Sequence, residues 1–325
     1  MQYAVMKWHF NTAVRFGNNK GQLADSGYIM HSDTLFSALC QEALKLGGEE
    51  ELTKLYTLCK AGKLLFSDTM PYIDETYFLP KPLMHIERAE QESSSVLKKA
   101  HKKLKYIPSD QYEAYIQSLA GKAEFDVHAV NNLMNDFAHQ DNRIMAGVTG
   151  NEDTKPFYVN TWTFAPSAGL YVIVGFENDD DLYWLETIMR HLGLSGVGGK
   201  KNSGLGKFDV DDVIFLDDAY SGGLEALQTL LAAEGTWQMT LSCALPTNEE
   251  LTNALDGAAY QILKRSGFVH SAGYADEQRK HNNLYVLSAG SCFKHKFAGD
   301  IYDIANGGKH AVYRYAKPLF LGVNV

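Results

Sequence analysis

The sequence predicts an α+β fold built from two related halves. Its 325 residues are 45% hydrophobic, which is enough to bury a core in each of two ordinary domains. Apolar residues alternate with a period of two in some segments and recur at helical spacing in others. Along the first half these segments follow the order strand, helix, two strands, helix, strand, and a similar series begins again after residue 235.

The chain opens with an expected strand at residues 3–10. Ala4, Met6, Trp8 and Phe10 point to one side and the intervening residues to the other, as in a strand that is half buried.

The first expected helix begins at Ser32, which is suited to the N-cap, and Asp33 suits the first turn. Leu35 and Leu39 lie on one face of it. Such a helix start also presents free N–H groups, so it is either a simple cap or a seat for a phosphate. A second helix is expected at 49–60.

A polar, charged segment at 85–150 interrupts this rhythm, and we predict an insertion that projects from the first domain. It includes an expected helix at 126–139. Strand signals resume at 157–164 and 170–176 with a proline and a glycine between them, which favours a hairpin.

A helix at about 181–192 and a strand at 207–216 complete the first half. The resulting order is that of a ferredoxin-like (RRM-like) domain, predicted at 1–220. A second ferredoxin-like domain is expected at 235–325. Its predicted elements are strands at 237–245, 284–293 and 312–315 and a helix at 249–264.

Composition excludes several classes of protein. The four cysteines lie far apart without a Cys-x-x-Cys pair, which argues against a zinc ribbon, a redox pair and a disulfide scaffold, so we interpret them as small core residues. The chain has no apolar run of eighteen residues, and its start lacks the pattern of a signal peptide. We therefore expect a cytoplasmic protein with no cofactor.

The net charge of −9 does not exclude a nucleic-acid partner, because salt screens surface charges beyond roughly 8–10 Å and local distribution decides. Residues 93–109 contain five lysines and no acid, whereas acidic residues gather at 49–51, 179–181 and 211–218. The sequence predicts basic surfaces for a polyanion, with ordinary solvated faces as the alternative. The five lysines are Lys98, Lys99, Lys102, Lys103 and Lys105.

The most informative segment is 193–206, where six of fourteen residues are glycine and lysines are interspersed. Glycines let a backbone approach a ligand and turn its N–H groups outward, and lysines suit phosphate. The segment is not a P-loop, because Leu194 stands where that motif needs glycine, and the third glycine of a dinucleotide fingerprint would fall on Lys201. It also joins a helix to a strand rather than the reverse. The alternative is a long αβ connection with Gly193 as helix C-cap.

Three motifs together resemble the RAMP superfamily of CRISPR proteins, and within it the guide-RNA-capping subunits of type III-A (Csm) effector complexes. They are His31-Ser32-Asp33-Thr34-Leu35-Phe36-Ser37-Ala38-Leu39, the glycine-rich loop through Phe208, and Val312-Tyr313-Arg314-Tyr315-Ala316-Lys317-Pro318-Leu319. The resemblance implies two ferredoxin-like domains that cap the 5′ handle of a guide RNA. It also implies docking onto a large polymerase-like subunit, a neighbouring backbone RAMP subunit, and no nuclease activity.

Transferred residue by residue, the resemblance implies an RNA-binding set with no catalytic or metal-binding member. The set is His31, Ser32, Arg143, Gly196, Gly198, Gly199, Lys200, Lys201, Asn202, Ser203, Gly204, Gly206 and Lys207. We expect the lysines to contact phosphates and Asn202 and Ser203 to contact base edges or sugars. Tyr3, His9 and Phe16 are either stacking platforms or core residues.

Two enzymatic alternatives remain. A metal-independent ribonuclease of the same superfamily would use His31 in acid–base chemistry, with Lys200 stabilising the developing charge. A metal-dependent enzyme would draw on the acidic clusters and the eleven histidines, although these show no metal-ligand spacing.

Overall fold

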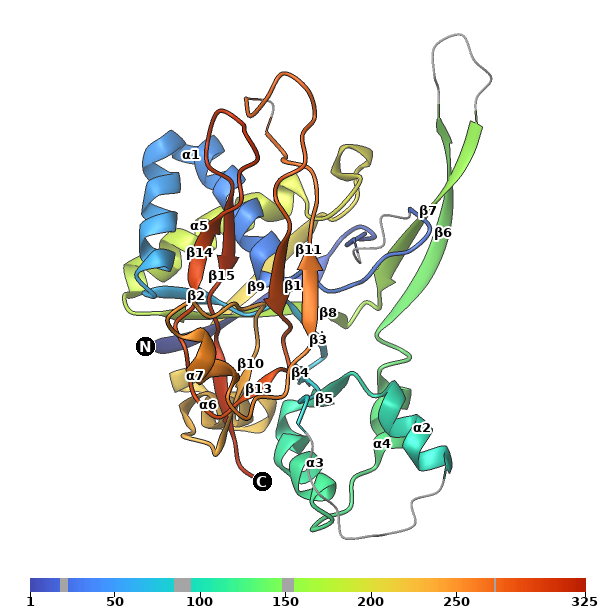
Figure 1. The fold of residues 1–325 in the computed structure, drawn as a ribbon. Helices are drawn as coiled ribbons and strands as arrows, with labels where there is room; N and C mark the ends of the chain where they lie inside the picture. The colour runs from blue at the N-terminus through green and yellow to red at the C-terminus, as the bar shows by residue number, and fades with distance from the viewer. Residues whose placement is uncertain (18–22, 85–94, 148–154, 272) are drawn as a thin grey trace.

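The computed structural model describes residues 1–17, 23–84, 95–147, 155–271 and 273–325, and a seven-stranded antiparallel sheet lies at its centre (Figure 1). The strand order is β5-β4-β3-β8-β1-β9, and β2 also pairs with β8. The bounds are β1 (Gln2–Phe10), β2 (Leu64–Phe66), β3 (Met70–Ile73), β4 (Thr76–Pro80), β5 (Tyr106–Pro108), β8 (Ala168–Phe176) and β9 (Phe208–Phe215).

Strand β1 follows the predicted alternation, but both of its faces are buried. Ala4, Met6 and Trp8 belong to a core on the side of the long helices, while Val5 belongs to a second core on the opposite side. The indole of Trp8 stacks on the ring of Phe208 with 4.2 Å between centroids. The sequence predicted that one face of this strand is buried, whereas the structure buries both faces because the sheet is covered on both sides.

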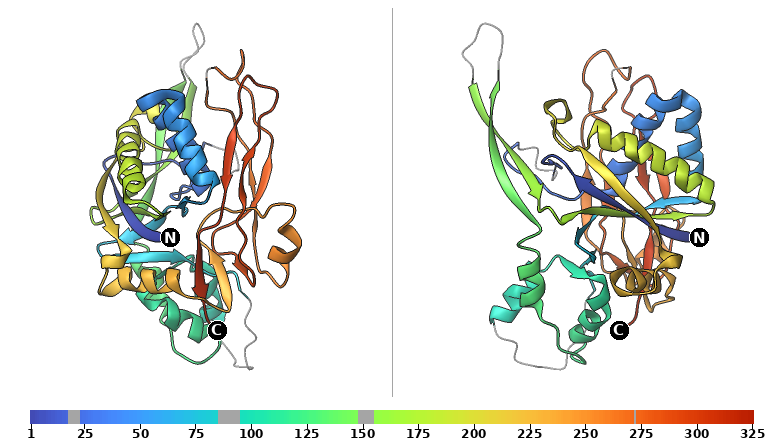
Figure 2. Two further views of the ribbon diagram at one scale, coloured as in Figure 1. Left: turned by 90° about the vertical axis from the view of Figure 1, so that its left-hand side faces the viewer. Right: turned by 180° about the vertical axis from the view of Figure 1, so that it is seen from behind.

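Two long helices, α1 and α5, cover one face of the sheet and pack on its strands to form the first core (Figure 2). Helix α1 is broken at Gly47 and Gly48, which have non-helical backbone angles, so its second part corresponds to the helix predicted at 49–60. The helices are α1 (Ser32–Lys60), α2 (Ser95–Lys103), α3 (Tyr112–Leu119), α4 (Val127–Leu133), α5 (Asp179–Ser195), α6 (Gly222–Ala232) and α7 (Leu251–Leu255).

The C-terminal part packs partly against the other face of the sheet and partly against α1, where Ile301 and Tyr315 join the first core. Met239 and Leu321 share a buried core with Val5 and Ile173, so the two predicted domains have a core in common. Its small antiparallel sheets comprise β13-β10-β16, β11-β12 and β14-β15. Their bounds are β10 (Trp237–Thr240), β11 (Ile262–Arg265), β12 (Leu284–Leu287), β13 (Cys292–Phe293), β14 (Asp300–Asp303), β15 (Tyr313–Ala316) and β16 (Phe320–Val323).

The helix predicted at 249–264 was wrong over most of its length. Helix α7 ends at Leu255, and Gly257 follows with a positive φ of 60°, the left-handed conformation that terminates helices. The chain then becomes extended and enters β11.

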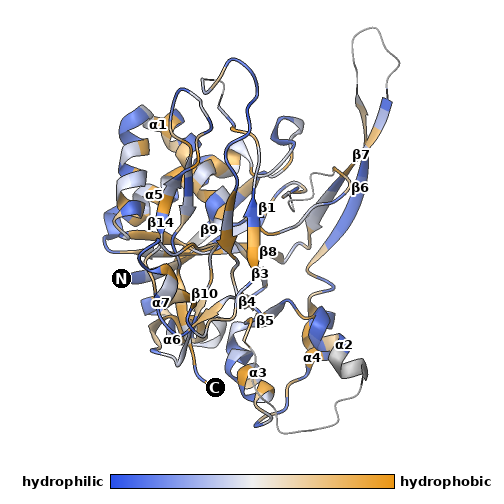
Figure 3. Ribbon diagram, in the orientation of Figure 1, coloured by the Kyte–Doolittle hydropathy of each residue, from blue (hydrophilic) through white to orange (hydrophobic). Residues whose placement is uncertain are grey.

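The hairpin predicted between 157–164 and 170–176 was also wrong. Strand β7 (Lys155–Phe164) pairs with β6 (Ala138–Gly147), whereas β8 pairs with β1, β2 and β3. All nine residues of β8 are buried between these neighbours, so no edge is left for β7. The predicted helix at 126–139 is correspondingly shorter, because α4 ends at Leu133 and β6 follows. The β6–β7 hairpin projects from the body, and β6 is hydrophilic over most of its length (Figure 3).

The predicted insertion is only partly separate. Helices α2, α3 and α4 lie together beside the central sheet (Figure 1), but β5 extends that sheet by pairing with β4. Residues 85–94 and 148–150 of the predicted insertion lie outside the described residues. Cys59, Cys243 and Cys292 are buried free thiols, as expected. Within the described ranges, no helix is long and apolar enough to cross a membrane.

Candidate nucleic-acid interface

The glycine-rich loop, residues 196–207, connects α5 to β9 and is pinned to the segment that follows β1. The N–H of Gly199 donates to the Arg15 carbonyl at 2.8 Å, and the N–H of Gly206 donates to the Ala13 carbonyl at 2.9 Å. The N–H of Val197 closes the base of the loop on the Gly206 carbonyl at 2.9 Å. These contacts hold the loop as a fixed arch.

Two of the glycines are required by close backbone contacts. A Cβ on Gly206 would lie 1.9 Å from the Val197 carbonyl oxygen, and one on Gly198 would lie 2.5 Å from the Arg15 carbonyl oxygen. Both residues also have positive φ values near 80°. These glycines therefore serve the packing of the loop on the protein itself.

This packing corrects the expectation that the loop turns its N–H groups outward. The N–H groups that donate to the protein's own oxygens are those of Gly196, Val197, Gly199, Ser203, Gly204, Gly206 and Lys207. The alternative of Gly193 as helix C-cap was wrong, because α5 continues to Ser195 and its C-cap is Gly196. Intramolecular packing explains several of the glycines. Anion binding by this loop would therefore draw on its side chains as well as on the remaining N–H groups.

The crest of the arch carries those side chains. Asn202, Ser203 and Lys207 are exposed, and Lys200 and Lys201 are partly exposed. Lys200 adopts a left-handed conformation with a φ of 64°, at the N-cap of a short 3₁₀ helix formed by residues 201–203.

Lys201 lies close to a second lysine, Lys45. Partial burial lowers its pKa, the neighbouring Lys45 lowers it further, and Glu42 opposes the shift. The ammonium of Lys45 is itself 2.6 Å from Oε1 of Glu42. An additional negative charge near Lys201 would relieve the repulsion between the two lysines.

Arg143 reaches the same region from the projecting hairpin. It is exposed on β6 opposite Val159, and Met145, two residues further on the same face, is opposite Phe157. The ammonium of Lys200 lies 5.0 Å from the centre of the Phe157 ring. The register therefore places Arg143 on the same face of the hairpin as Phe157, and Lys200 contacts that ring from the loop. Sequence reasoning missed Phe157.

Arg15 is a second residue that sequence reasoning missed. Its guanidinium lies beside Gly199 and donates to the Asp25 carbonyl at 3.4 Å. Burial lowers its pKa and Asp25 opposes that shift. Its place five residues after the predicted first strand was the only available signal.

The start of α1 is built differently from the prediction. Ser32 is the first helical residue rather than the cap, and its N–H donates to Oδ1 of Asp68 at 2.8 Å. Its hydroxyl is fully buried and accepts from the N–H of Cys243. The seat predicted for a phosphate is thus filled by a carboxylate of the protein, and Ser32 is not available to a ligand.

The adjacent Asp33 is a buried joint between the two parts of the chain. Its carboxylate accepts from Arg265 Nε at 2.7 Å and from Arg314 Nη1 at 2.9 Å. Burial alone would raise its pKa, but the two guanidinium groups outweigh burial and hold the pKa well below its usual value. Arg314 also contacts Nε2 of His281 at 2.9 Å.

His31 is held by Asp68 and stays partly accessible. Its Nδ1 lies 2.6 Å from Oδ2 of Asp68, and 28% of its side chain is exposed. With Cys243 these residues place three potential metal ligands within 4.8 Å of one another. A tetrahedral zinc ion, with ligands at about 2.0–2.1 Å, would hold them roughly 3.3 Å apart. The 2.6 Å separation and the raised pKa of the buried Cys243 thiol fit a hydrogen-bonded joint instead.

Comparison with known proteins identifies the family. The family model described as the CRISPR Csm4 C-terminal domain matches residues 233–323. The Csm4 protein of the CRISPR system of Mycobacterium tuberculosis is 35% identical over 299 residues, which cover 90% of this chain and 89% of that protein. The chain belongs to the Csm4 family. Csm4 of Streptococcus thermophilus is 30% identical over 331 residues and covers all of both chains. The resemblance seen in the three sequence motifs is therefore confirmed.

Solved structures of Csm4 assemblies share the fold. A chain in the crystal structure of a Csm3–Csm4 subcomplex of the type III-A interference complex matches with a TM-score of 0.66 at 18% identity, covering all of both chains. A chain in the crystal structure of a Csm1–Csm4 cassette with cA4 matches with a TM-score of 0.59 at 17% identity, covering 99% of this chain and 98% of that one. The mixed α/β architecture with antiparallel sheets agrees with the predicted class.

The other predicted RNA contacts in this Csm4-family chain differ in accessibility. Phe16 is buried in the first core, and Tyr3 packs against the second, so these two act as core residues. His9 is partly exposed. Lys102, Lys103 and Lys105 are exposed near the end of α2, as a basic surface requires.

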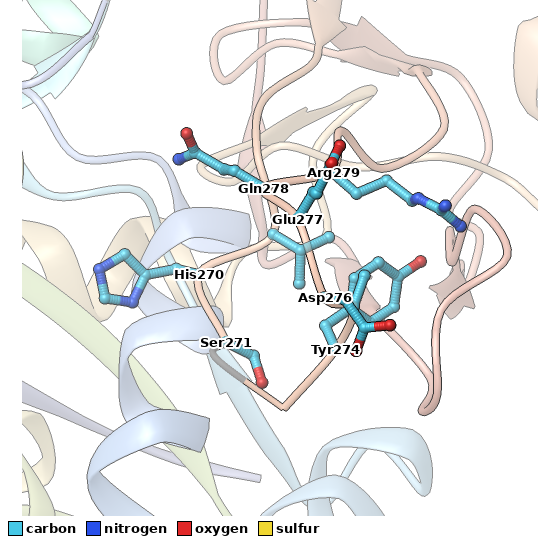
Figure 4. Close-up of a pocket in the computed structure, with 9 residues that line it drawn as sticks. His270, Ser271, Tyr274, Asp276, Glu277, Gln278 and Arg279 are labelled. Atoms are coloured by element: carbon cyan, nitrogen blue, oxygen red, sulfur yellow. The ribbon is translucent and has the colours of Figure 1, made fainter.

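A hollow of about 440 Å³ lies within the loop that joins β11 to β12, away from these residues in sequence (Figure 4). Two of its charged lining residues have partners within the protein, since Asp276 pairs with Lys309 at 2.8 Å and Arg279 donates to the Gly307 carbonyl at 2.7 Å. The ring of Tyr274 is buried, and its hydroxyl accepts from the backbone N–H of Asn306. The hollow is therefore a consequence of how this loop folds on itself.

Proposed function

We propose that this chain is a non-catalytic RNA-binding subunit of a type III-A CRISPR effector complex, which caps the 5′ handle of the guide RNA. The observation that carries the proposal is the contact of the Lys200 ammonium with the Phe157 ring, 5.0 Å from its centre, beside the exposed crest of the arch, with Arg143 on the same face of the hairpin as that ring. Cationic groups around an accessible aromatic ring suit the phosphates and unstacked bases of a single strand. Membership of the Csm4 family supports the same role.

The partners follow from the same membership. The similar solved chains come from Csm3–Csm4 and Csm1–Csm4 assemblies. We propose that this chain likewise contacts a backbone RAMP subunit and the large polymerase-like subunit, in the cytoplasm.

The finer fold assignment is also part of the proposal. Strand order β3-β8-β1-β9, with α1 and α5 packed on one face, supports a ferredoxin-like N-terminal domain over residues 1–220. The C-terminal domain at 235–325 is proposed to be a second, reduced ferredoxin-like unit, supported by its antiparallel sheets.

Replacing Lys200 and Lys201 by alanine tests the role of the arch. We expect weaker binding of single-stranded guide-repeat RNA and a salt dependence reduced by roughly 1.4 in its logarithmic slope, about 0.7 for each phosphate that is no longer neutralised. Lys63→Ala/Lys122→Ala removes two exposed lysines elsewhere and serves as the matched control. Equal binding by the arch variant and the control would refute the assignment.

A second function, metal-independent RNA cleavage, is favoured by the pair of His31 and Asp68. The carboxylate at 2.6 Å orients the imidazole as in a general acid–base pair, and the ring is partly accessible. Incubation with repeat RNA separates the two functions. Cleavage that His31→Ala abolishes would establish the enzyme, whereas intact, retained RNA supports the cap.

A further inference from the structure

The β11–β12 ribbon exposes an unusual row of apolar side chains. Ile262 and Tyr285 are each 56% exposed, although they lie in paired strands. Lys264 is opposite Tyr285 and is also exposed. The residues that alternate with these along the ribbon point to its inner side, and one of them, Arg265, is buried against Asp33. One face of the ribbon is thus turned to solvent with an aromatic ring, an aliphatic chain and an ammonium on it. The strands β11 and β12 that carry them are seen in Figure 1.

This face continues beyond β11 in both directions. Tyr260, two residues before Ile262, is 42% exposed, and Phe268 is 52% exposed. Phe268 bridges to Lys280, whose ammonium lies 5.3 Å from the Phe268 ring centre. Between the Arg265–Leu284 pair and this bridge, the segment that leads into β12 has one residue more than the segment that follows β11. This extra residue forms a bulge, which keeps Lys280 on the exposed face.

The charge of this region contrasts with the rest of the chain. The chain has 39 acidic residues among 325, yet 257–275 and 280–299 contain none. The two stretches carry Lys264, Lys280, Lys294 and Lys296, and Arg265 is already neutralised by Asp33. Asp276 and Glu277 lie between the two stretches, in the loop that joins the strands, whereas among the described residues the exposed face of the ribbon carries lysines as its only charged residues, which is complementary to a polyanion.

We propose that this ribbon face, defined by Tyr260, Lys264, Phe268, Lys280 and Tyr285, is a second binding surface for single-stranded RNA. The aromatic rings stack on unpaired bases and the two lysines lie against phosphates. RNA fits better than a protein partner, because lysine is depleted from protein–protein interfaces, whereas here it alternates with the aromatic rings. The inference rests on the proposed function, since it extends the RNA contact beyond the arch.

The test uses the full chain with fluorescein-labelled oligouridine RNAs of increasing length, because a second surface is engaged only by longer strands. The variant is Tyr260→Ser/Phe268→Ser/Tyr285→Ser, and Tyr183→Ser/Tyr220→Ser, which alters exposed tyrosines elsewhere, is the control. Each base–ring stack contributes about five-fold or more in affinity. We therefore expect the ribbon variant to bind the long RNA at least ten-fold more weakly and the shortest RNA normally. Thermal melting confirms that the variants fold.

The outcomes separate this inference from the proposed function. Loss of binding by the Lys200/Lys201 variant together with unchanged binding by the ribbon variant at every length would overturn the ribbon inference alone. Absence of RNA binding by the wild-type chain would overturn both. Unchanged RNA affinity with reduced co-purification of the large subunit would show that the face docks protein, and would also overturn the inference. A folded Lys264→Ala/Lys280→Ala variant is expected to bind long RNA more weakly with a shallower salt dependence, and unchanged behaviour would count against the inference.

Discussion

Replacing Asp33 by asparagine tests the joint that holds α1 against the C-terminal part of the chain. The carboxylate is completely buried, and the side chains of Arg265 and Arg314 are only 8% and 12% exposed. Asparagine keeps the shape of the side chain but removes its charge, so two guanidinium groups lose their counter-ion in the interior. Removing one partner of a buried ion pair costs about 3–5 kcal/mol.

This loss of stability is large enough to measure by differential scanning calorimetry. The entropy of unfolding is about 2.1 cal/mol/K per residue, or roughly 0.7 kcal/mol/K for a chain of this length that unfolds as one unit. The substitution is therefore expected to lower Tm by about 4–7 °C. The matched control is Asp276→Asn, which breaks a pair whose carboxylate is 92% exposed, and its Tm should stay within about 1 °C of wild type. An equally small change for Asp33→Asn would refute the reasoning.

The pH dependence gives an independent check of the same joint. Since the pKa of Asp33 is lowered on folding, its contribution is complete above the unfolded-state pKa of about 3.9 and is lost as the pH falls below that value. Wild type and Asp33→Asn should therefore differ most near neutrality and converge in acid. A difference in Tm that stays constant down to strong acid would contradict the assignment.

Two further predictions concern the loop and a histidine. Gly206→Ala should lower Tm and weaken RNA binding, because its Cβ would overlap the Val197 carbonyl. The control Gly204→Ala has a similar φ but open space around it, so it should cost only about 1–2 kcal/mol of backbone strain. Equal melting temperatures for the two variants would contradict this prediction. Burial lowers the pKa of His281; a hydrogen bond to the Asn282 carbonyl opposes this shift and the charge of Arg314 reinforces it. The unfolded chain therefore binds more protons than the folded one, and the free energy of unfolding should fall as the pH drops below about 6.5. His281→Gln keeps an acceptor for Arg314 and should flatten the dependence of Tm on pH across this range, and an unchanged pH dependence would exclude His281 as the cause.

Local elements could be predicted from the sequence where the pattern was strong. The alternation at Ala4, Met6 and Trp8 and the spacing of apolar residues in 181–192 predicted β1 and α5 correctly. Strand pairing could not be predicted, because it depends on contacts distant in sequence. The strands at 157–164 and 170–176 were predicted, but their sequence did not reveal that β7 would leave the sheet to pair with β6.

The candidate site shows the same division. The position of the loop and its lysines followed from composition, but the reason for Gly198 and Gly206 lies in carbonyl groups of Arg15 and Val197 that only folding brings near. Ser32 fitted the pattern of a helix cap, yet the capping carboxylate comes from Asp68, thirty-six residues later. Sequence patterns cannot detect a cap supplied by another element.

The use of the loop's backbone for packing changes how it must bind. Because the N–H groups of Gly199 and Gly206 are already satisfied, affinity would draw on the side chains at the crest as well as on the remaining N–H groups. The same hydrogen bonds fix the backbone beneath Lys200 and place its ammonium over Phe157, so less conformational entropy is lost when a strand binds. If the arch binds RNA as proposed, preorganised charge rather than a flexible backbone that closes around phosphate would supply its affinity. Stiffness, which the glycine content seemed to exclude, is the property that positions the lysines.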